Sequence, residues 1–145
     1  MDSELIVIKN KDQIALCFDA FKELRPHLDK GAFIEQVLRQ KEQSYQIIAI
    51  KEGGAIVSAA GFRVAEFLAW GKVLYIDDLT TLTEYRGKGY AAYLIDWLIN
   101  YAQEHECQGL HLDTGHHRHT AHKLYLKKGL NINSHHLSLE FEYNT

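Results

Sequence analysis

The chain of 145 residues contains little proline or cysteine, the residues that restrict the backbone or cross-link small proteins. It has one proline and only two cysteines, Cys17 and Cys107. Two cysteines are too few for a disulfide framework and fit a reducing compartment. No apolar run is long enough to span a membrane, and the N-terminus lacks the basic and then apolar pattern of a signal peptide. The sequence therefore predicts a cytoplasmic protein with no membrane partner.

Strong charge of either sign is also missing. The net charge of −3 argues against a general nucleic-acid binder, so no nucleic-acid partner is expected. An apolar content of 46% and a charged content of 24% are ordinary for a globular protein. The length suits one domain over residues 1–145, large enough to fold without disulfides or metal.

Hydrophobic periodicity predicts a mixed α/β fold. Apolar spacing near the helical repeat favours helices at residues 12–27, around 33–38, at 90–103 and at 119–128. Short apolar or alternating runs favour strands at residues 5–9, 45–51, 55–68, 73–82, 110–114 and 137–143. Glycine turns join the second, third and fourth of these strands into an antiparallel meander. The strand–helix–strand order of residues 73–114 predicts a right-handed crossover with parallel strands.

The segment 85–91, Tyr-Arg-Gly-Lys-Gly-Tyr-Ala, lies between a predicted strand and a predicted helix. A glycine-rich turn before a helix leaves backbone N–H groups unpaired, and the helix N-terminus adds partial positive charge. Arg86 and Lys88 bring formal charge to the same place, which suits a phosphate or pyrophosphate. The spacing Arg-x-x-Gly-x-Ala nevertheless occurs by chance in roughly one such chain in seven, so its context decides its meaning.

That context resembles the GCN5-related N-acetyltransferase (GNAT) family. The run 75–91, YIDDLTTLTEYRGKGYA, resembles the central motif of the family, and the run 121–130, AHKLYLKKGL, resembles its A-x-x-L-Y-x-K-x-G-F segment. The resemblance implies the GNAT fold, with a mostly antiparallel sheet of about six to seven strands flanked by helices and a parallel β-α-β crossover at the cofactor site.

The resemblance also implies acetyl-coenzyme A as acyl donor. The exposed edge of the strand at Leu79, Thr80 and Thr81 would pair with the pantetheine arm, much as an added β-strand would. The backbone amides of the following turn would bind the pyrophosphate, at Arg86, Gly87, Lys88, Gly89, Tyr90 and Ala91. Arg118 stands where many relatives carry asparagine, and an arginine could bond a phosphate oxygen instead.

Candidate catalytic groups follow from the same resemblance. Tyr125 would be the general acid that protonates the departing thiolate, although a tyrosine on an amphipathic helix is more usually a core residue. Asp77 and Asp78 are consecutive in a strand, so their side chains point to opposite faces unless a bulge intervenes. Asp78 is the first candidate for accepting the proton of the amine, and Asp77 for contacting the substrate; either could equally be a salt-bridged surface acid.

The histidines near residues 111–122 invite a metal reading, but neither cysteine lies among them and no metal is expected. His136 could reach the acceptor pocket or lie on the surface. An aromatic and acidic lining suited to a cationic amine is suggested near the meander, although all of its residues could also be core: Phe62, Glu66, Phe67, Trp70 and Tyr75.

The sequence thus predicts an acyltransferase that moves an acetyl group from acetyl-coenzyme A to a primary amine by direct attack. The alternative is a non-catalytic module that binds coenzyme A or another nucleotide as a sensor. The amine could belong to a small molecule or to a peptide, and a homodimer could form through the last alternating strand.

Overall fold

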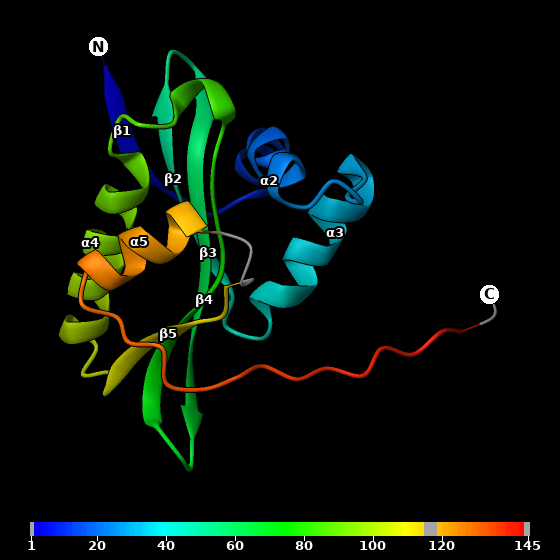
Figure 1. Ribbon diagram of the computed structural model, residues 1–145. Coiled ribbons are helices and arrows are strands. Elements are labelled where there is room, and N and C mark those ends of the chain that lie inside the picture. Colours follow the sequence, from blue (N-terminus) through cyan, green and yellow to red (C-terminus); the bar gives the residue numbers. More distant parts are fainter. Residues whose placement is uncertain (1, 115–118, 144–145) are drawn as a thin grey trace. The chain divides into compact units, whose positions relative to one another are not determined.

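The computed structural model of the protein describes residues 2–114 and 119–143. The chain divides into two compact units, residues 1–112 and residues 113–145. The first unit contains a five-stranded sheet in the order β1-β2-β3-β4-β5 (Figure 1). Whether the whole chain behaves as one domain, as the length suggests, stays a prediction.

The strands and helices follow the expected order as far as α5, except that one expected helix is divided in two. The strands are β1 (Ser3–Ile8), β2 (Gln46–Glu52), β3 (Ala55–Phe67), β4 (Gly71–Thr81) and β5 (Gly109–Leu112). The helices are α1 (Lys11–Leu16), α2 (Phe18–Leu24), α3 (Lys30–Lys41), α4 (Tyr90–Glu104) and α5 (His119–Lys127), with a short 3-10 turn η1 (Thr83–Tyr85). Strands β1 to β4 pair antiparallel, and β5 joins β4 in parallel through the α4 crossover. The mixed, mostly antiparallel sheet is confirmed, with five strands among the described residues instead of about six to seven.

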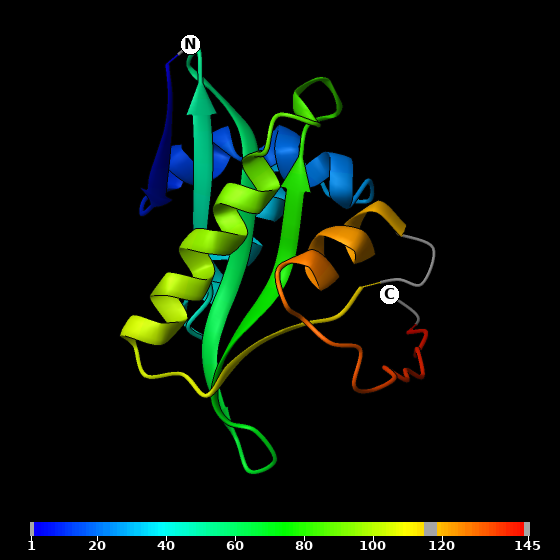
Figure 2. The same ribbon diagram turned by 60° about the vertical axis from the view of Figure 1, so that its left-hand side comes forward.

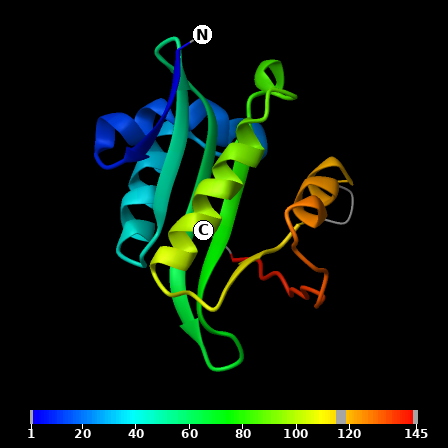
Figure 3. The same ribbon diagram turned by 90° about the vertical axis from the view of Figure 1, so that its left-hand side faces the viewer.

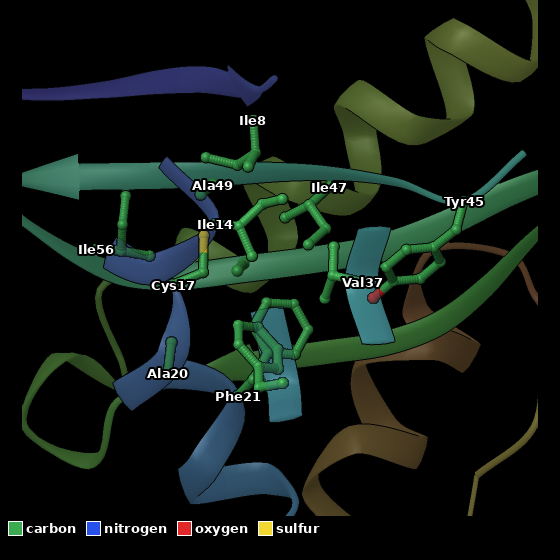
Figure 4. Close-up of a cluster of buried hydrophobic side chains, with 12 residues drawn as sticks. Ile8, Ile14, Cys17, Ala20, Phe21, Val37, Tyr45, Ile47, Ala49 and Ile56 are labelled. Carbon is green, nitrogen blue, oxygen red and sulfur yellow. The ribbon is translucent and has the colours of Figure 1, made fainter. Parts of the chain in front are cut away.

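Helices cover both faces of the sheet. Helices α1, α2 and α3 lie on one face and α4 on the other (Figures 2 and 3). The core between the sheet and the first three helices is built of aliphatic and aromatic side chains, among them Ile14, Phe21, Val37, Tyr45 and Ile47 (Figure 4). Burial of such side chains contributes about 1.5–3 kcal/mol each and fixes which face each helix presents. None of the described helices is long and apolar enough to cross a lipid bilayer.

The helix expected at residues 12–27 is two short helices. Cys17 ends α1 and also precedes α2, with its amide bonded to Ile14 O at 3.0 Å in a tightened last turn. The second helix ends at Leu24, and Arg25 has left the helical region with φ −123° and ψ 81°. Because Pro26 follows, the α conformation is disfavoured for Arg25. This early end directs the Arg25 side chain back toward the sheet.

The strand expected at residues 137–143 is not formed. The described residues 128–143 contain no helix or strand, and Leu137, Leu139, Phe141 and Tyr143 are 87, 78, 70 and 82% exposed. Alternation of apolar and polar residues shows which face a strand would bury, but a strand is stable only when another strand accepts its backbone hydrogen bonds. No such ladder partner is present within the described part of the chain. The local pattern was therefore insufficient.

Close packing of β3 against Tyr45 requires glycine at position 61. A Cβ built on Gly61 would lie 1.8 Å from Tyr45 Oη and 2.4 Å from Tyr45 Cζ. No side chain fits at that distance unless the buried phenol moves. Gly61 therefore sets the position of the Tyr45 hydroxyl.

We expect Gly61→Ala to lower the free energy of unfolding by about 1–3 kcal/mol, because the added methyl overpacks the site. Urea denaturation followed by circular dichroism measures the effect. Gly31→Ala is the matched control: its Cβ would come no closer than 3.8 Å, to Asp29 Oδ2, and alanine favours the helix by up to about 1 kcal/mol. Equal stability changes in the two variants would contradict the close contact.

Candidate functional site

Strand β4 extends beyond the end of its parallel partner β5. The parallel pairing covers Val73–Ile76 of β4, opposite Gly109–Leu112, whereas the antiparallel pairing with β3 continues to Thr81. Among the described strands, the stretch 77–81 of β4 therefore has a ladder partner on one side only. Alternate peptide groups of such a stretch point away from the paired neighbour, so they can pair with another extended chain.

A glycine turn follows this open edge. Gly87 and Gly89 have φ values of +78° and +87°, a left-handed conformation that disfavours other residues. Gly89 is the N-cap of α4, where no side-chain cap bond forms and no acidic residue occupies the first turn. The first N–H groups of the helix thus lack the usual side-chain acceptors. Apart from their chain neighbours, no atom of the described residues lies within 4 Å of the Cβ position of either glycine, so there is open space beside the turn.

Arg86 and Lys88 bring positive charge to the turn. Arg86 Nε donates to Thr81 O at 3.2 Å, and its Nη2 lies 3.5 Å from Glu23 Oε1. Lys88 Nζ lies 4.9 Å from the ring centroid of Tyr85 and has no ion-pair partner in the described part of the chain. Arg86 therefore ties the turn to the end of β4, while the exposed Lys88 is available to an anion.

Tyr90 anchors the start of α4 to the sheet. Its hydroxyl donates to the carboxylate of Glu52, which lies at the end of β2. This hydrogen bond to an anionic acceptor raises the pKa of Tyr90 above its ordinary value. The backbone around the turn is thereby held in one place.

A β-bulge places the two consecutive acids of β4 in one cluster. Gly61 pairs with Asp78 and Phe62 pairs with Ile76, so Asp77 is the extra residue on β4. A regular strand would send the two carboxylates to opposite faces. Here Arg25 Nη2 donates to the backbone carbonyl of Asp77 at 3.2 Å and to the carboxylate of Asp78, at Oδ1, at 2.9 Å. Besides burial, the charges of both acids raise the pKa of the one Tyr45 side chain.

The Asp78 carboxylate is held by donors on both oxygens. Arg25 Nε and Nη2 donate to Oδ1 at 3.2 and 2.9 Å, and Tyr45 Oη donates to Oδ2 at 2.8 Å. Burial raises the pKa of Tyr45 well above its ordinary value, and the neighbouring Asp78 charge adds to the shift. Tyr45 therefore remains a neutral donor to Asp78.

Arg63 donates two hydrogen bonds to the carboxylate of Asp77. Nε donates to Oδ1 at 3.1 Å and Nη2 donates to Oδ2 at 2.5 Å, while the guanidinium lies 5.4 Å from the centroid of the Tyr45 ring. The pKa of Asp77 is nevertheless raised, because burial outweighs the two bonds from Arg63 and the Asp78 charge adds to the effect. The same pair raises the pKa of Arg63, so this guanidinium stays charged. The strand thus carries two half-buried acids, each with its own arginine.

Comparison with known proteins identifies the family of this chain. Residues 12–130 match the model of the acetyltransferase (GNAT) family. The chain belongs to this family. An uncharacterized N-acetyltransferase of Bacillus subtilis, YhdJ, is 31% identical over 130 residues, which cover 88% of this chain and 91% of the relative.

Solved GNAT structures share the fold. An acetyltransferase of Trypanosoma brucei superposes with a TM-score of 0.81 at 20% identity, covering 97% of this chain and all of that one. AAC(6')-Iy in complex with the bisubstrate analogue CoA-S-monomethyl-acetylneamine superposes with a TM-score of 0.80 at 16% identity, covering 98% and 99%. With family and fold in agreement, the GNAT protein described above is an acyltransferase.

The second unit carries further residues singled out in the sequence. Tyr125 lies on α5 and is buried. His136 Nδ1 lies 3.3 Å from Asp113 Oδ2, with both side chains largely exposed, and it does not lie on a strand. Arg118 falls outside the described residues. The roles expected of these residues in this acetyltransferase stay predictions.

The histidine cluster is described only in part, since His116 and His117 also lie outside the described residues. Among residues 2–114 and 119–143, no three histidine, cysteine or acidic side chains come together in a way that could hold a metal ion.

Sequence reasoning missed the partners of the two acids. Arg25, Tyr45 and Arg63 come from three separate segments and carry no motif. The available signal was indirect, because acids expected inside a strand need cationic or hydrogen-bonding partners. The sequence therefore indicates that the two acids need partners, but only the fold shows which residues these are.

We expect Tyr45→Phe to lower the free energy of unfolding by about 1–3 kcal/mol near neutral pH, because Asp78 loses a donor inside the protein. The pKa of Tyr45 is raised in the folded state, so above its ordinary value of 10.0 the folded state holds a proton that the unfolded state has lost. Stability therefore falls as the pH rises, and the advantage of the native protein over Tyr45→Phe should shrink by about 1 kcal/mol by about pH 11. Urea unfolding of both proteins across this range measures the difference, and a constant difference would contradict the assigned hydrogen bond.

Proposed function

We propose that this acyltransferase uses acetyl-coenzyme A as donor and transfers its acetyl group to a primary amine by direct attack. The proposal rests on one observation: two stretches of backbone with unpaired peptide groups follow each other closely along the chain. The unpaired edge of β4 ends at Thr81, and the uncapped turn into α4 begins at Arg86. An extended amide-containing arm fits the first surface, and a pyrophosphate fits the second. Coenzyme A combines both groups in one molecule.

The cofactor contacts proposed are mainly backbone contacts. Peptide groups of Leu79, Thr80 and Thr81 would pair with the pantetheine arm, and the amides from Arg86 to Ala91 would bind the pyrophosphate. The side chain of Thr80 is occupied elsewhere, donating to Ala20 O at 2.9 Å, which supports a backbone role. Arg118 is proposed as a further phosphate contact.

The proposed reaction needs a base for the amine and an acid for the thiolate. The neutral amine attacks the thioester carbon, a C–N bond forms and the C–S bond breaks. The surplus proton on nitrogen passes to Asp78 directly or through water, and Tyr125 gives a proton to the departing thiolate. N–H groups of the open β4 edge would stabilise the charge that develops on the carbonyl oxygen.

Asp78 suits this role through its orientation. Arg25 and Tyr45 hold its carboxylate in a fixed position, so little reorganisation is needed when a proton arrives. Asp77, half-buried at the bulge, is proposed as the contact for the amine, and His136 as a further acceptor contact. The complex of AAC(6')-Iy carries an acetylneamine analogue, and we propose an amine acceptor of small-molecule size here as well.

One observation favours a second candidate function. Both acids of β4 are already engaged by arginines, an arrangement that would also suit a protein that binds coenzyme A without catalysis. The two candidates differ in thiol release. With acetyl-coenzyme A and a panel of primary amines, catalysis releases free thiol, whereas a sensor binds coenzyme A tightly and releases none.

We expect Gly89→Ala to weaken coenzyme A binding about tenfold, because the αL backbone at φ +87° is strained by a side chain and the helix N-terminus shifts. Isothermal titration calorimetry measures the affinity. Gly53→Ala is the matched control, since Gly53 also has positive φ, +60°, with open space around its Cβ position, but it lies in the β2–β3 turn. Equal affinities for the two variants would remove the turn from the cofactor site.

We expect Tyr125→Phe to lower kcat by about 10- to 100-fold with little change in coenzyme A affinity, because the variant loses only the proton donor for the thiolate. Stopped-flow or steady-state thiol release measures kcat, and calorimetry measures the affinity. Tyr143→Phe, which alters an exposed tyrosine, is the control. Unchanged turnover in Tyr125→Phe would exclude the tyrosine from the mechanism.

A further inference from the structure

A surface cavity of about 450 Å³, open to solvent, lies beside the bulge of β4. Its volume falls in the range of small-molecule sites, about 300–1,000 Å³. One wall comes from α3 and the turn after it, and the other from β3 and β4. The lining residues are Gln36, Arg39, Gln40, Gln43, Arg63 and Asp77. The cavity therefore touches the same bulge that carries the candidate base.

The lining of this cavity is polar and carries a surplus of positive charge. Two arginines and one aspartate give a formal charge of 2 − 1 = +1, with three uncharged amides beside them. Arg63 is committed to Asp77, whereas Arg39 forms no ion pair with any described residue. One cation in the cavity thus has no anionic partner of its own.

The carbonyl end of α3 does not cancel this charge. Its last carbonyls accept amide donors from the following turn, from Glu42 to Arg39 O at 3.1 Å, from Gln43 to Gln40 O at 2.8 Å and from Tyr45 to Gln40 O at 3.1 Å. The helix end therefore presents mainly amide and guanidinium groups to the cavity. Such groups recognise carboxylates and phosphates.

The expected aromatic and acidic lining is not what surrounds this space. Phe62 is fully buried and packs against Trp97 and Tyr101 of α4. Trp70 lies near the β3–β4 hairpin, where its ring stacks on His111 at 4.3 Å. A cationic acceptor held by aromatic rings is therefore not what the cavity favours.

We infer that this cavity is the acceptor site and that it selects a small primary amine carrying a carboxylate or a phosphate. Arg39 and the neighbouring amides bind the anionic group, and Asp77 contacts the amine near Asp78. The inference rests on the proposed function, because it names the acceptor class of that reaction. Arg39 is then a specificity-determining residue outside the motifs of the sequence.

The test compares amines that differ only in the anionic group. Thiol release from acetyl-coenzyme A is measured with 2-aminoethyl phosphate against ethanolamine and with glycine against glycinamide, at equal concentrations of the neutral amine. We expect the anionic member of at least one pair to have the higher kcat/KM, by about tenfold or more, and the two pairs distinguish phosphate from carboxylate. The preference ratio is kcat/KM for the anionic amine divided by kcat/KM for its neutral partner. Arg39→Gln should lower this ratio about tenfold, mainly by raising KM for the anionic amine, and Arg39→Lys should restore part of it.

Lys30→Gln is the matched control, because it removes one positive charge from the exposed start of α3 away from the cavity. It should leave the ratio unchanged. Equal use of both members of each pair, preference for the neutral members, or an unchanged ratio in Arg39→Gln would overturn the inference while leaving acetyl transfer intact.

A binding measurement separates the inference from the proposed reaction. If no amine releases thiol, acetyl transfer to these amines fails, and the cavity is tested by NMR titration with 2-aminoethyl phosphate and glycine in the absence of acetyl-coenzyme A. Binding is followed through shifts of the arginine Nε–Hε signals. A dissociation constant that rises about tenfold in Arg39→Gln, and not in Lys30→Gln, would support the cavity as an anion site. No perturbation by either compound in the native protein would overturn it.

Discussion

The short pairing between β4 and β5 is the constraint on which the site depends. Four residues of β5 pair with Val73–Ile76, and the residues of β4 that follow, 77–81, lack a strand on that side within the described chain. If β5 followed β4 to Thr81, the peptide groups of the open edge would be consumed in a ladder, and no extended ligand could pair there. The open edge is therefore a product of where this pairing stops.

The bulge at Asp77 adds a second constraint, because it gathers two carboxylates that a regular strand would separate. Two acids inside a fold are tolerated only with partners, since an unpaired buried charge is costly. Arg25 and Arg63 supply those partners from a helix end and from the neighbouring strand. Pro26 contributes indirectly, because it ends α2 before Arg25 can continue the helix. The chemistry of β4 is thus held by residues far away in sequence.

Local features were readable from the sequence, and long-range ones were not. The turn at residues 86–91 could be predicted because a glycine pair, a preceding strand and a following amphipathic helix are all adjacent in the chain. The crossover from β4 to β5 followed from chain order and handedness. The bulge depends on the register between Gly61 and Asp78, and Gly61 owes its identity to the phenol of Tyr45. Residues 137–143 show the opposite case. Their alternation is a clear local strand pattern, but no neighbouring strand pairs with them in the described chain.

The charge pattern around the bulge explains how a protein of net charge −3 can present a cationic pocket. Asp77 and Asp78 are each neutralised by an arginine, so the cluster contributes little net field, and Arg39 remains as the uncancelled charge. At physiological salt such a charge acts over about 8 Å. Selection of an anionic acceptor would therefore arise from contact inside the pocket, and attraction by the whole protein surface is not needed.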